Sequence, residues 1–299
     1  MTTTATRKRT NNKNRTSVYA LVTERILSRL ESGVIPWKKP WGGAAGMPQN
    51  LISRKGYRGI NAFLLACTDY ESPYWLTFKQ AKDLGGSVRK GEKSEPVIFW
   101  NEAESTDPDT GEEKTRRFLR YYRVFNLAQC DLPDDKLPEE PDAQPTGPRD
   151  PIASCEAVVD GMPNRPEIRQ GFRKAAYVPA SDEIVMPDLQ RFDSMPDYYA
   201  TLFHELGHST GHASRLDRPE ITEPNRFGSE PYGREELVAE MSAAYLCHHA
   251  GIETETIDNA AAYVGGWLKA IKKDETLIVK AASAAQKAAS FILGDAPAA

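Results

Sequence analysis

Residues 194–212 read SMPDYYATLFHELGHSTGH and carry the strongest structural signal in the C-terminal half of the chain. Ser194 followed three residues later by Asp197 resembles a capping box and indicates the start of a helix. Gly211 is a typical stop signal just beyond the end of one. The stretch therefore predicts a single helix that carries a histidine-rich segment in its last turns.

The segment His204-Glu205-Leu206-Gly207-His208 carries the chemistry of this helix. Positions four apart lie on one helix face, so His204 and His208 can bind the same ion. Two histidines and one further ligand leave a position open for water, as a catalytic zinc site requires. Glu205 stands beside the ion, where a general base for that water belongs, and we assign it the catalytic role.

The third ligand is expected from a second helix at residues 232–249, YGREELVAEMSAAYLCHH. Three glutamates compete for the role: Glu235, Glu236 and Glu240. Glu236 and Glu240 are four residues apart and share a face, so one arrangement makes Glu236 the ligand. Glu240 would then be a second carboxylate that orients a ligand histidine, and Glu235 a solvated neighbour.

His212 is a rival third ligand, but its spacing from His208 is four residues rather than the six expected of a third histidine. Two histidines and a glutamate favour zinc as the cofactor, and the same set accepts manganese. We therefore predict one divalent metal ion in the C-terminal half.

A short strand with the sequence DEIVMP, at residues 182–187, precedes the histidine helix. We expect an edge strand here that borders the cleft and could pair with an extended peptide. A plain sheet edge is the alternative.

The charge is divided unevenly along the chain. Residues 1–130 hold 22 lysines and arginines against 13 acidic residues, whereas residues 131–299 hold 16 against 29. The net charge of −4 hides this asymmetry. A basic half joined to an acidic half indicates a polyanionic partner for the first.

The basic half reads as an α+β unit. Helical spacing at residues 18–30 follows a possible cap at Ser17 or Thr16, and residues 59–70 and 77–84 read as short helices. The runs PVIFW and RRFLRYYRVF are rich in β-formers, with an acidic, turn-rich stretch between them, and predict a β-hairpin with a long loop.

Residues 131–151 contain six prolines and seven acidic residues, so we expect a linker there without packed elements. The predicted organisation is a basic arm at 1–15, a first domain at 16–130, the linker, and a second domain at 152–299. The second domain should be mainly helical with a small sheet, which makes the whole an α+β protein of two domains.

Cations and aromatic rings alternate in the first domain in the way that single-stranded nucleic acid requires, because cations follow the backbone and rings stack on bases. We expect Trp37, Trp41 and Tyr57 to be exposed platforms, whereas Trp75, Phe99 and Phe125 should pack. No basic recognition helix for duplex DNA is evident. The candidate nucleic-acid-binding residues are Trp37, Lys38, Lys39, Trp41, Arg54, Lys55, Tyr57, Arg58, Arg89 and Lys90.

The composition, with 40% hydrophobic and 27% charged residues, is that of a globular chain. No apolar run is long enough to span a membrane, and residues 1–16 lack the apolar core of a secretory signal. The four cysteines are scattered without a Cys-x-x-Cys pair, so we expect reduced thiols and a cytoplasmic location without membrane partners.

These motifs resemble the plasmid antirestriction protein ArdC family. In the first half the resemblance rests on PWKKPW, on the pattern from Asn50 to Asn61, on Trp75 to Ala81 and on YYRVFN. In the second half it rests on HELGHSTGHASRLDR and EELVAEMSAAYL. It implies a single-stranded-DNA-binding domain, related to domains of plasmid conjugative primases, followed by a zincin-like metallopeptidase domain.

The resemblance also implies a function: protection of plasmid DNA that arrives as a single strand during conjugation, with metal-site roles for His204, Glu205 and His208. A second hypothesis is an active metalloprotease that cleaves a host protein at DNA. A third is a decoy that occupies a host restriction enzyme without touching DNA.

Overall fold

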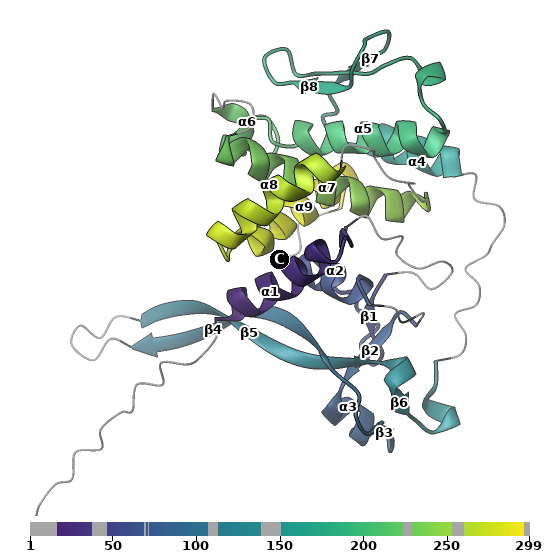
Figure 1. Ribbon diagram of the computed structural model, residues 1–299, viewed down its shortest axis with the longest axis vertical. Helices are drawn as coiled ribbons and strands as arrows, with labels where there is room; N and C mark the ends of the chain where they lie inside the picture. The colour runs from purple at the N-terminus through teal and green to yellow at the C-terminus, as the bar shows by residue number, and fades with distance from the viewer. Residues whose placement is uncertain are drawn as a thin grey trace, which may run out of the picture.

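The computed structural model describes residues 17–37, 47–68, 70, 72–106, 113–138, 151–223, 229–252 and 260–295. These residues form an α+β protein of two domains, stacked one above the other in Figure 1. The N-terminal domain is the lower one, and a long β-hairpin projects from its side. The C-terminal domain, mainly helical, lies above it.

The N-terminal domain is built around a small sheet. Its elements in chain order are α1 (Val18–Glu31), β1 (Gln49–Asn50), α2 (Ile60–Ala66), β2 (Tyr74–Thr77), α3 (Phe78–Asp83), β3 (Ser87–Val88), β4 (Glu95–Thr106), β5 (Glu113–Asn126), η2 (Leu127–Gln129), β6 (Cys130–Asp131) and η3 (Asp134–Lys136). The main sheet has the order β1-β2-β5-β4, and β3 pairs with β6 in a separate ribbon.

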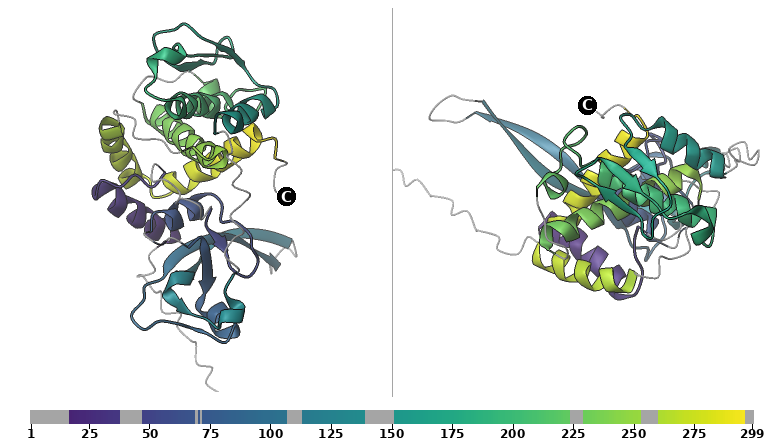
Figure 2. Two further views of the ribbon diagram at one scale, coloured as in Figure 1. Left: turned by 90° about the vertical axis from the view of Figure 1, so that its right-hand side faces the viewer. Right: turned by 90° about the horizontal axis from the view of Figure 1, so that it is seen from above.

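The predicted hairpin is confirmed and is longer than its β-forming runs. β4 has 12 residues and β5 has 14, whereas β2 has only 4. β2 pairs with β5 only from Val124 to Asn126, so the part of β5 before Val124 has β4 as its single neighbour. The hairpin therefore extends beyond the sheet, as both views of Figure 2 show.

The predicted helix starts in this domain follow from side-chain caps. Ser17 Oγ accepts a hydrogen bond from Ala20 N at the start of α1. At α3 the Thr77 and Gln80 side chains form a reciprocal capping box. The helix expected at residues 59–70 is present but ends earlier, at Ala66.

The C-terminal domain consists of helices and one small sheet. Its elements are α4 (Pro151–Gly161), β7 (Glu167–Arg169), β8 (Ala176–Val178), β9 (Glu183–Val185), η4 (Leu189–Arg191), α5 (Met195–Ser209), α6 (Pro219–Thr222), α7 (Glu230–Ala250), α8 (Ala260–Lys273) and α9 (Leu277–Ile292). Helices α5, α7 and α9 pack together beneath the sheet.

The prediction of an edge strand at residues 182–187 is wrong. The sheet order is β7-β9-β8, so β9 is the central strand and has hydrogen-bonded neighbours on both sides. Its backbone groups are therefore not open to an extended peptide. β8, at residues 176–178, is the edge that contacts α5.

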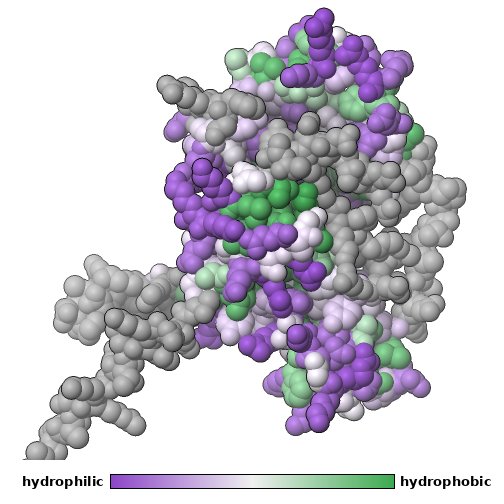
Figure 3. Space-filling view, in the orientation of Figure 1, coloured by the Kyte–Doolittle hydropathy of each residue, from purple (hydrophilic) through white to green (hydrophobic). Residues whose placement is uncertain are grey.

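One hydrophobic core runs through both domains. Val22, Ile26 and Leu30 of α1 belong to the same buried cluster as Trp267 of α8 and Ile278 of α9. Figure 2 shows α1 lying against these C-terminal helices. Near the middle of the face drawn in Figure 3, hydrophobic side chains also reach the surface, with hydrophilic ones around them.

Polar contacts join the domains at the start of α2. Tyr245 Oη of α7 donates to Gly59 O at 2.8 Å, and Gly59 N donates to Gln286 Oε1 of α9 at 3.2 Å. The φ of Gly59 is +57°, a backbone conformation that a side chain would strain. This turn therefore fixes the direction in which α2 leaves the domain boundary.

The expected linker at residues 131–151 holds regular structure at both ends. Asp131 belongs to β6, which pairs with β3, and Leu132 packs against a small core that includes Leu76. A turn of 3-10 helix follows, and α4 begins at Pro151. The prediction that no packed element lies here is thus wrong at its ends, while residues 139–150 and the arm at 1–15 lie outside the described residues.

The four cysteines are free and buried. None of the helices in the described parts of the chain has the length and apolar character needed to cross a membrane.

Asn61 joins the exposed edge of the hairpin to the core. Its amide Nδ2 donates to Ile98 O at 2.7 Å, and its Oδ1 accepts from Ile98 N at 2.8 Å. β4 is an edge strand, so without Asn61 both backbone groups would be buried without a partner.

We expect Asn61→Ala to lower the free energy of unfolding by about 2–4 kcal/mol, because one buried donor and one buried acceptor lose their partners. Chemical denaturation measures the change. Asn101→Ala, on the same hairpin, is the control and should change it by less than about 0.5 kcal/mol. Equal stability of the two variants would contradict the role assigned to Asn61.

Candidate metal centre

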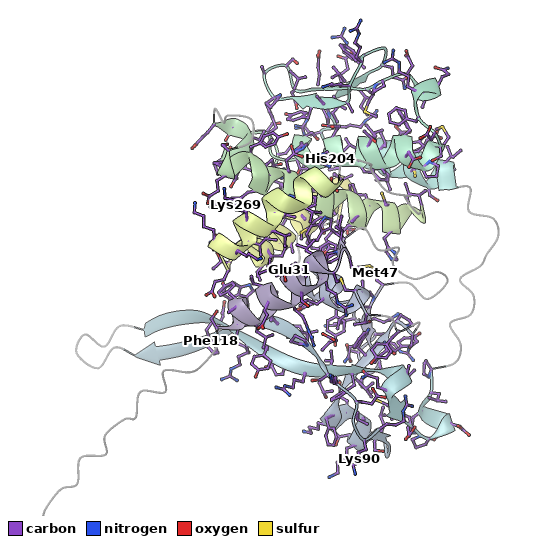
Figure 4. All side chains as sticks on the ribbon, viewed as in Figure 1. Glu31, Met47, Lys90, Phe118, His204 and Lys269 are labelled. Carbon is purple, nitrogen blue, oxygen red and sulfur yellow. The ribbon has the colours of Figure 1, made fainter. Side chains whose placement is uncertain are left out.

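The histidine helix begins and runs as the sequence predicts. Ser194 Oγ accepts from Asp197 N at 3.2 Å and caps α5. His204 and His208 then lie on the same helix face, with their Nε2 atoms 3.1 Å apart. Their side chains are only 16% and 12% exposed, so both imidazoles lie in a largely dry site. Figure 4 labels His204, which lies in the upper domain.

Helix α7 brings Glu236 to the two imidazoles. One carboxylate oxygen lies 3.5 Å from His204 Nε2 and the other 3.7 Å from His208 Nε2. Ligands about 2.0–2.2 Å from one ion lie about 3.3–3.6 Å apart in a tetrahedral site. His204, His208 and Glu236 are therefore spaced to hold a divalent metal ion, and they form the metal-ligand cluster found among the described residues.

Gly207 lets the two helices come this close. A Cβ atom at Gly207 would lie 3.1 Å from Ala239 Cα and 3.2 Å from Ser242 Cβ of α7. A larger residue would push α7, and Glu236 with it, away from the histidines. The glycine of the HELGH segment thus has a packing role that the sequence pattern alone does not reveal.

Glu235 is not the solvated neighbour that we expected. It is 3% exposed, and its Oε1 lies 3.2 Å from His208 Nδ1. Arg218 donates to both oxygens of the same carboxylate, at 2.6 and 2.9 Å. Glu235 can therefore accept the Nδ1 proton of His208, which leaves Nε2 with its lone pair toward the ion.

Glu240 faces the other histidine at longer range. Its Oε1 lies 3.9 Å from His204 Nδ1, beyond hydrogen-bonding distance. Burial works against charge on His204, but the carboxylates of Glu236, Glu240 and Glu205 outweigh it and raise the His204 pKa. Burial also opposes the charge of Glu236, yet the histidines lower its pKa. The carboxylates around His204 and His208 thus favour a positive charge at this position, which a bound cation would supply.

Glu205 is held by the edge strand of the small sheet. Its Oε2 accepts from the backbone N–H of Tyr177 in β8 at 2.7 Å. Oε1 has no hydrogen-bond partner within the described part of the chain. One carboxylate oxygen is therefore fixed, and the other can accept a proton from a water molecule.

A second arginine holds β8 in place. Arg215, with a side chain 1% exposed, donates to both carboxylate oxygens of Asp182 at 2.7 and 2.8 Å. Asp182 also accepts from Tyr177 Oη at 2.8 Å. The segment after α5 is thus fastened to the strand that holds Glu205. His212, the rival ligand, contacts Ser214 and lies outside the metal-ligand cluster.

Two of the three expected aromatic platforms of the first domain, Trp37 and Tyr57, are buried. Trp37 is 2% exposed and packs edge-on against Trp267 at 5.3 Å, and Tyr57 is 8% exposed. The prediction that these two rings are exposed platforms is wrong, because Trp37 packs in the core shared by the two domains and Tyr57 packs in a small cluster of the N-terminal domain. Lys38, Lys39 and Trp41 lie outside the described residues.

The predicted cations do not gather in one place. Arg54, Lys55 and Arg58 are exposed near the start of α2, and Arg54 lies over the Tyr74 ring. Arg89 pairs with the neighbouring acids Glu92 and Asp131. Lys90 is exposed at the lower end of the domain, well away from the hairpin residue Phe118 in Figure 4.

The hairpin also carries a cluster of exposed rings that was not predicted from the sequence. Phe99 was expected to pack but is 44% exposed, because it lies where β4 and β5 extend beyond β2. Trp100, Tyr121 and Tyr122 are exposed there as well. The sequence did contain the alternation of cations and rings in Arg120-Tyr121-Tyr122-Arg123. Whether those rings are exposed depends on the length of β2, which ends before it reaches them. Trp75 and Phe125 pack as expected.

Comparisons with known proteins agree with this fold. Residues 156–284 match the model of a zincin-like metallopeptidase family, and residues 16–125 match that of the N-terminal domain of anti-restriction factor ArdC. The molecule is thus a zincin-like metallopeptidase domain joined to an ArdC-type N-terminal domain. The chain belongs to the ArdC family of antirestriction proteins.

Two crystal structures of the antirestriction ArdC protein from plasmid R388 are similar over 93% of this chain. The metal-free structure is 39% identical in sequence, has a TM-score of 0.74, and is matched over 97% of its own length. The Mn(II)-bound structure is 37% identical in sequence, has a TM-score of 0.73, and is matched over 98% of its own length.

Two curated relatives differ in length. DNA primase TraC of Escherichia coli is 38% identical over 91% of this chain, but the chain spans only 26% of that protein. The uncharacterized protein y4eC of Sinorhizobium fredii (strain NBRC 101917 / NGR234) is 34% identical over 93% of this chain and is covered to 92%.

We expect Glu235→Gln to weaken metal binding by about 10–100-fold, because the neutral amide no longer stabilises the His208 Nδ1 proton. Competition with a coloured chelator measures the affinity. Glu230→Gln, at the exposed start of the same helix, is the control and should bind as the wild type does. An unchanged affinity in Glu235→Gln would remove this carboxylate from the metal centre.

Proposed function

We propose that the chain is an antirestriction protein that binds single-stranded DNA through the β4–β5 hairpin and holds one divalent ion at His204, His208 and Glu236. In this proposal it protects plasmid DNA that enters a new host as a single strand. The observation that carries the proposal is a row of exposed and half-buried rings, with a cation beside them, on one face of the hairpin.

This ring–cation row consists of Phe99, Tyr122, Phe118 and Arg120. The Phe99 and Tyr122 rings lie 5.6 Å apart in an edge-to-face pair. The Arg120 guanidinium lies 5.1 Å from the centre of the Phe118 ring. Arg120 is also directly opposite Phe99 in the register of the two strands. Flat rings beside a cation fit unpaired bases and the phosphates between them.

The strand register places two acidic positions of the hairpin in the alternation opposite to the ring–cation row. Side chains alternate between the two faces of a strand, so residues two apart share a face. On β5 the positions of Lys114 and Arg116 continue the alternation of Arg120, and their partners in register are Ser105 and Ala103. The acidic positions Glu102 and Glu104 fall in the opposite alternation. Between Val97 and Asn101 of β4 and between Phe118 and Tyr122 of β5, the face of the ring–cation row therefore carries no carboxylate that would repel phosphate.

We expect Phe99→Ala and Tyr122→Ala each to weaken binding of an oligothymidylate about tenfold, because each removes a ring that can stack on a base. Fluorescence anisotropy at fixed salt measures the affinity. Phe78→Ala is the control, because Phe78 is 59% exposed on α3, away from the hairpin.

The proposal also requires that the wild-type affinity fall steeply with salt, as phosphate contacts dictate. A protein that binds duplex DNA equally well, or hairpin variants that bind like Phe78→Ala, would contradict it.

The ion is the second part of the proposal. Zinc suits two imidazoles and a carboxylate, and manganese accepts the same donors. A similar ArdC protein has a Mn(II)-bound structure, and metal content measured after purification from the native host would decide between the two.

A metalloprotease is the second candidate function, and the position of Glu205 favours it. A bound ion lowers the pKa of a water ligand toward neutrality. Glu205 Oε1 would take the proton of that water, while the Tyr177 amide keeps Oε2 in place. Glu205 would then return the proton to the leaving amine of a cleaved peptide.

We expect Glu205→Ala to abolish any peptide cleavage while the ion stays bound, because Glu205 is a base and not a ligand. Mass spectrometry of a DNA-bound protein substrate, with metal analysis of the same sample, tests both halves. If the wild-type protein cleaved neither unfolded nor DNA-bound proteins, the metalloprotease function would be contradicted and the role of the ion would be structural.

The remaining alternative is a decoy that occupies a host restriction enzyme, which would then be the protein partner. Each of these functions would be carried out in the cytoplasm. Deletion of residues 1–130 is unsuitable as a test of the decoy, because it removes helices of the shared core. The hairpin variants are better, since protection that survives the loss of DNA binding would favour the decoy.

A further inference from the structure

A cavity of about 600 Å³ lies between the two domains, on the other face of the hairpin from the ring–cation row. Its walls come from the start of α2, from β4 and β5, from α9 and from Leu216 in the segment after α5. Cavities of about 300–1,000 Å³ are typical of pockets that bury a small organic group. This one is large enough for a single ring system.

Apolar side chains form most of the cavity wall. Ile60, Ile98 and Leu119 come from the N-terminal domain, and Val279 and Phe291 from α9. Flat apolar walls of this kind accept the face of an aromatic ring. The ligand should therefore be planar and largely uncharged where it enters.

Polar and cationic groups stand among these walls. Arg58 is exposed and donates to Ser290 Oγ at 2.9 Å, and Lys287 is exposed on α9. Gln286 accepts from Gly59 N through Oε1, which leaves its side-chain NH2 without a partner among the described residues. Asp295 is the acid that lines the cavity. Two cations with amide and hydroxyl groups fit a base that is attached to phosphates.

Trp100 connects the cavity with the ring–cation row. It lines the cavity, is 60% exposed, and directly follows Phe99 on β4. β4 is the edge strand, so Phe99 and Trp100 face opposite sides of an edge that no other strand covers. A flexible single strand can pass over this edge from one ring to the other, which a stiff duplex cannot do.

We propose that the cavity receives one unstacked base of the bound single strand, with Trp100 at its mouth and the flanking phosphates at Arg58 and Lys287. The inference rests on the proposed binding of single-stranded DNA and adds a site for an individual nucleotide. In a single strand a base leaves its neighbours at low cost, whereas in a duplex pairing must also be broken. The cavity therefore selects for unpaired DNA.

A Ser283→Trp variant tests this site. Ser283 lies on the exposed side of α9 and lines the cavity, so an indole there fills the space without entering the core. Ser28→Trp makes the same change on the exposed side of α1, outside the cavity lining, and is the matched control. We expect Ser283→Trp to weaken oligothymidylate binding about tenfold, as the loss of one stacked base does, and Ser28→Trp to leave it unchanged.

Photo-crosslinking of the wild-type protein gives an independent measurement that needs no variant. An oligothymidylate with one 4-thiothymine should crosslink to Trp100 or Phe291, with the crosslinked residue identified by fragment sequencing because Phe99 shares a peptide with Trp100. Crosslinks confined to Phe99, Phe118 or Tyr122 would overturn the inference, and so would equal affinities of the two tryptophan variants. If either result were found while the wild-type protein still bound the oligonucleotide, only the base-binding cavity would be contradicted and the proposed function would stand. If the wild-type protein did not bind single-stranded DNA at all, both the cavity and the proposed function would be contradicted.

Discussion

The near-contact of α5 and α7 at Gly207 is the constraint on which the metal centre depends. Histidines at positions i and i+4 share a face in any helix, so α5 alone supplies two ligands. The third ligand comes from another helix, and the carboxylate of Glu236 reaches the imidazoles only because Gly207 lies against the backbone of Ala239. Side-chain packing thus sets the ligand geometry, and Ser242, buried below, completes the contact.

Two arginines then orient the groups around the ion position. Arg218 neutralises the buried carboxylate that faces His208, and it also donates to the last carbonyls of α5. Arg215 fastens β8 through Asp182 and so fixes the amide that holds Glu205. Both arginines come from the turn that follows the histidine helix. A buried carboxylate without such a partner would carry a large desolvation cost, so these pairs are a condition for the site.

Local patterns predicted the parts of the molecule that local physics determines. The spacing of His204 and His208 and the hairpin follow from helical and strand periodicity, and the structure brings Glu236 to the site as expected. Exposure was harder to predict. Phe99 is exposed because the neighbouring strand is short, and Trp37 is buried because helices from the far end of the chain cover it. Both depend on contacts between distant segments, which no window of sequence contains.

The core shared by the two domains also bears on whether the two halves of the protein can exist separately. Helix α1 buries its apolar face against α8 and α9, at the opposite end of the chain, so neither half has a complete interior without the other. Cutting the gene between the halves would expose both faces to water and favour aggregation. We therefore expect the two halves to fold stably only when they are joined in one chain. The longer primase relatives fit this view, since their similarity to the chain runs through both halves rather than through one.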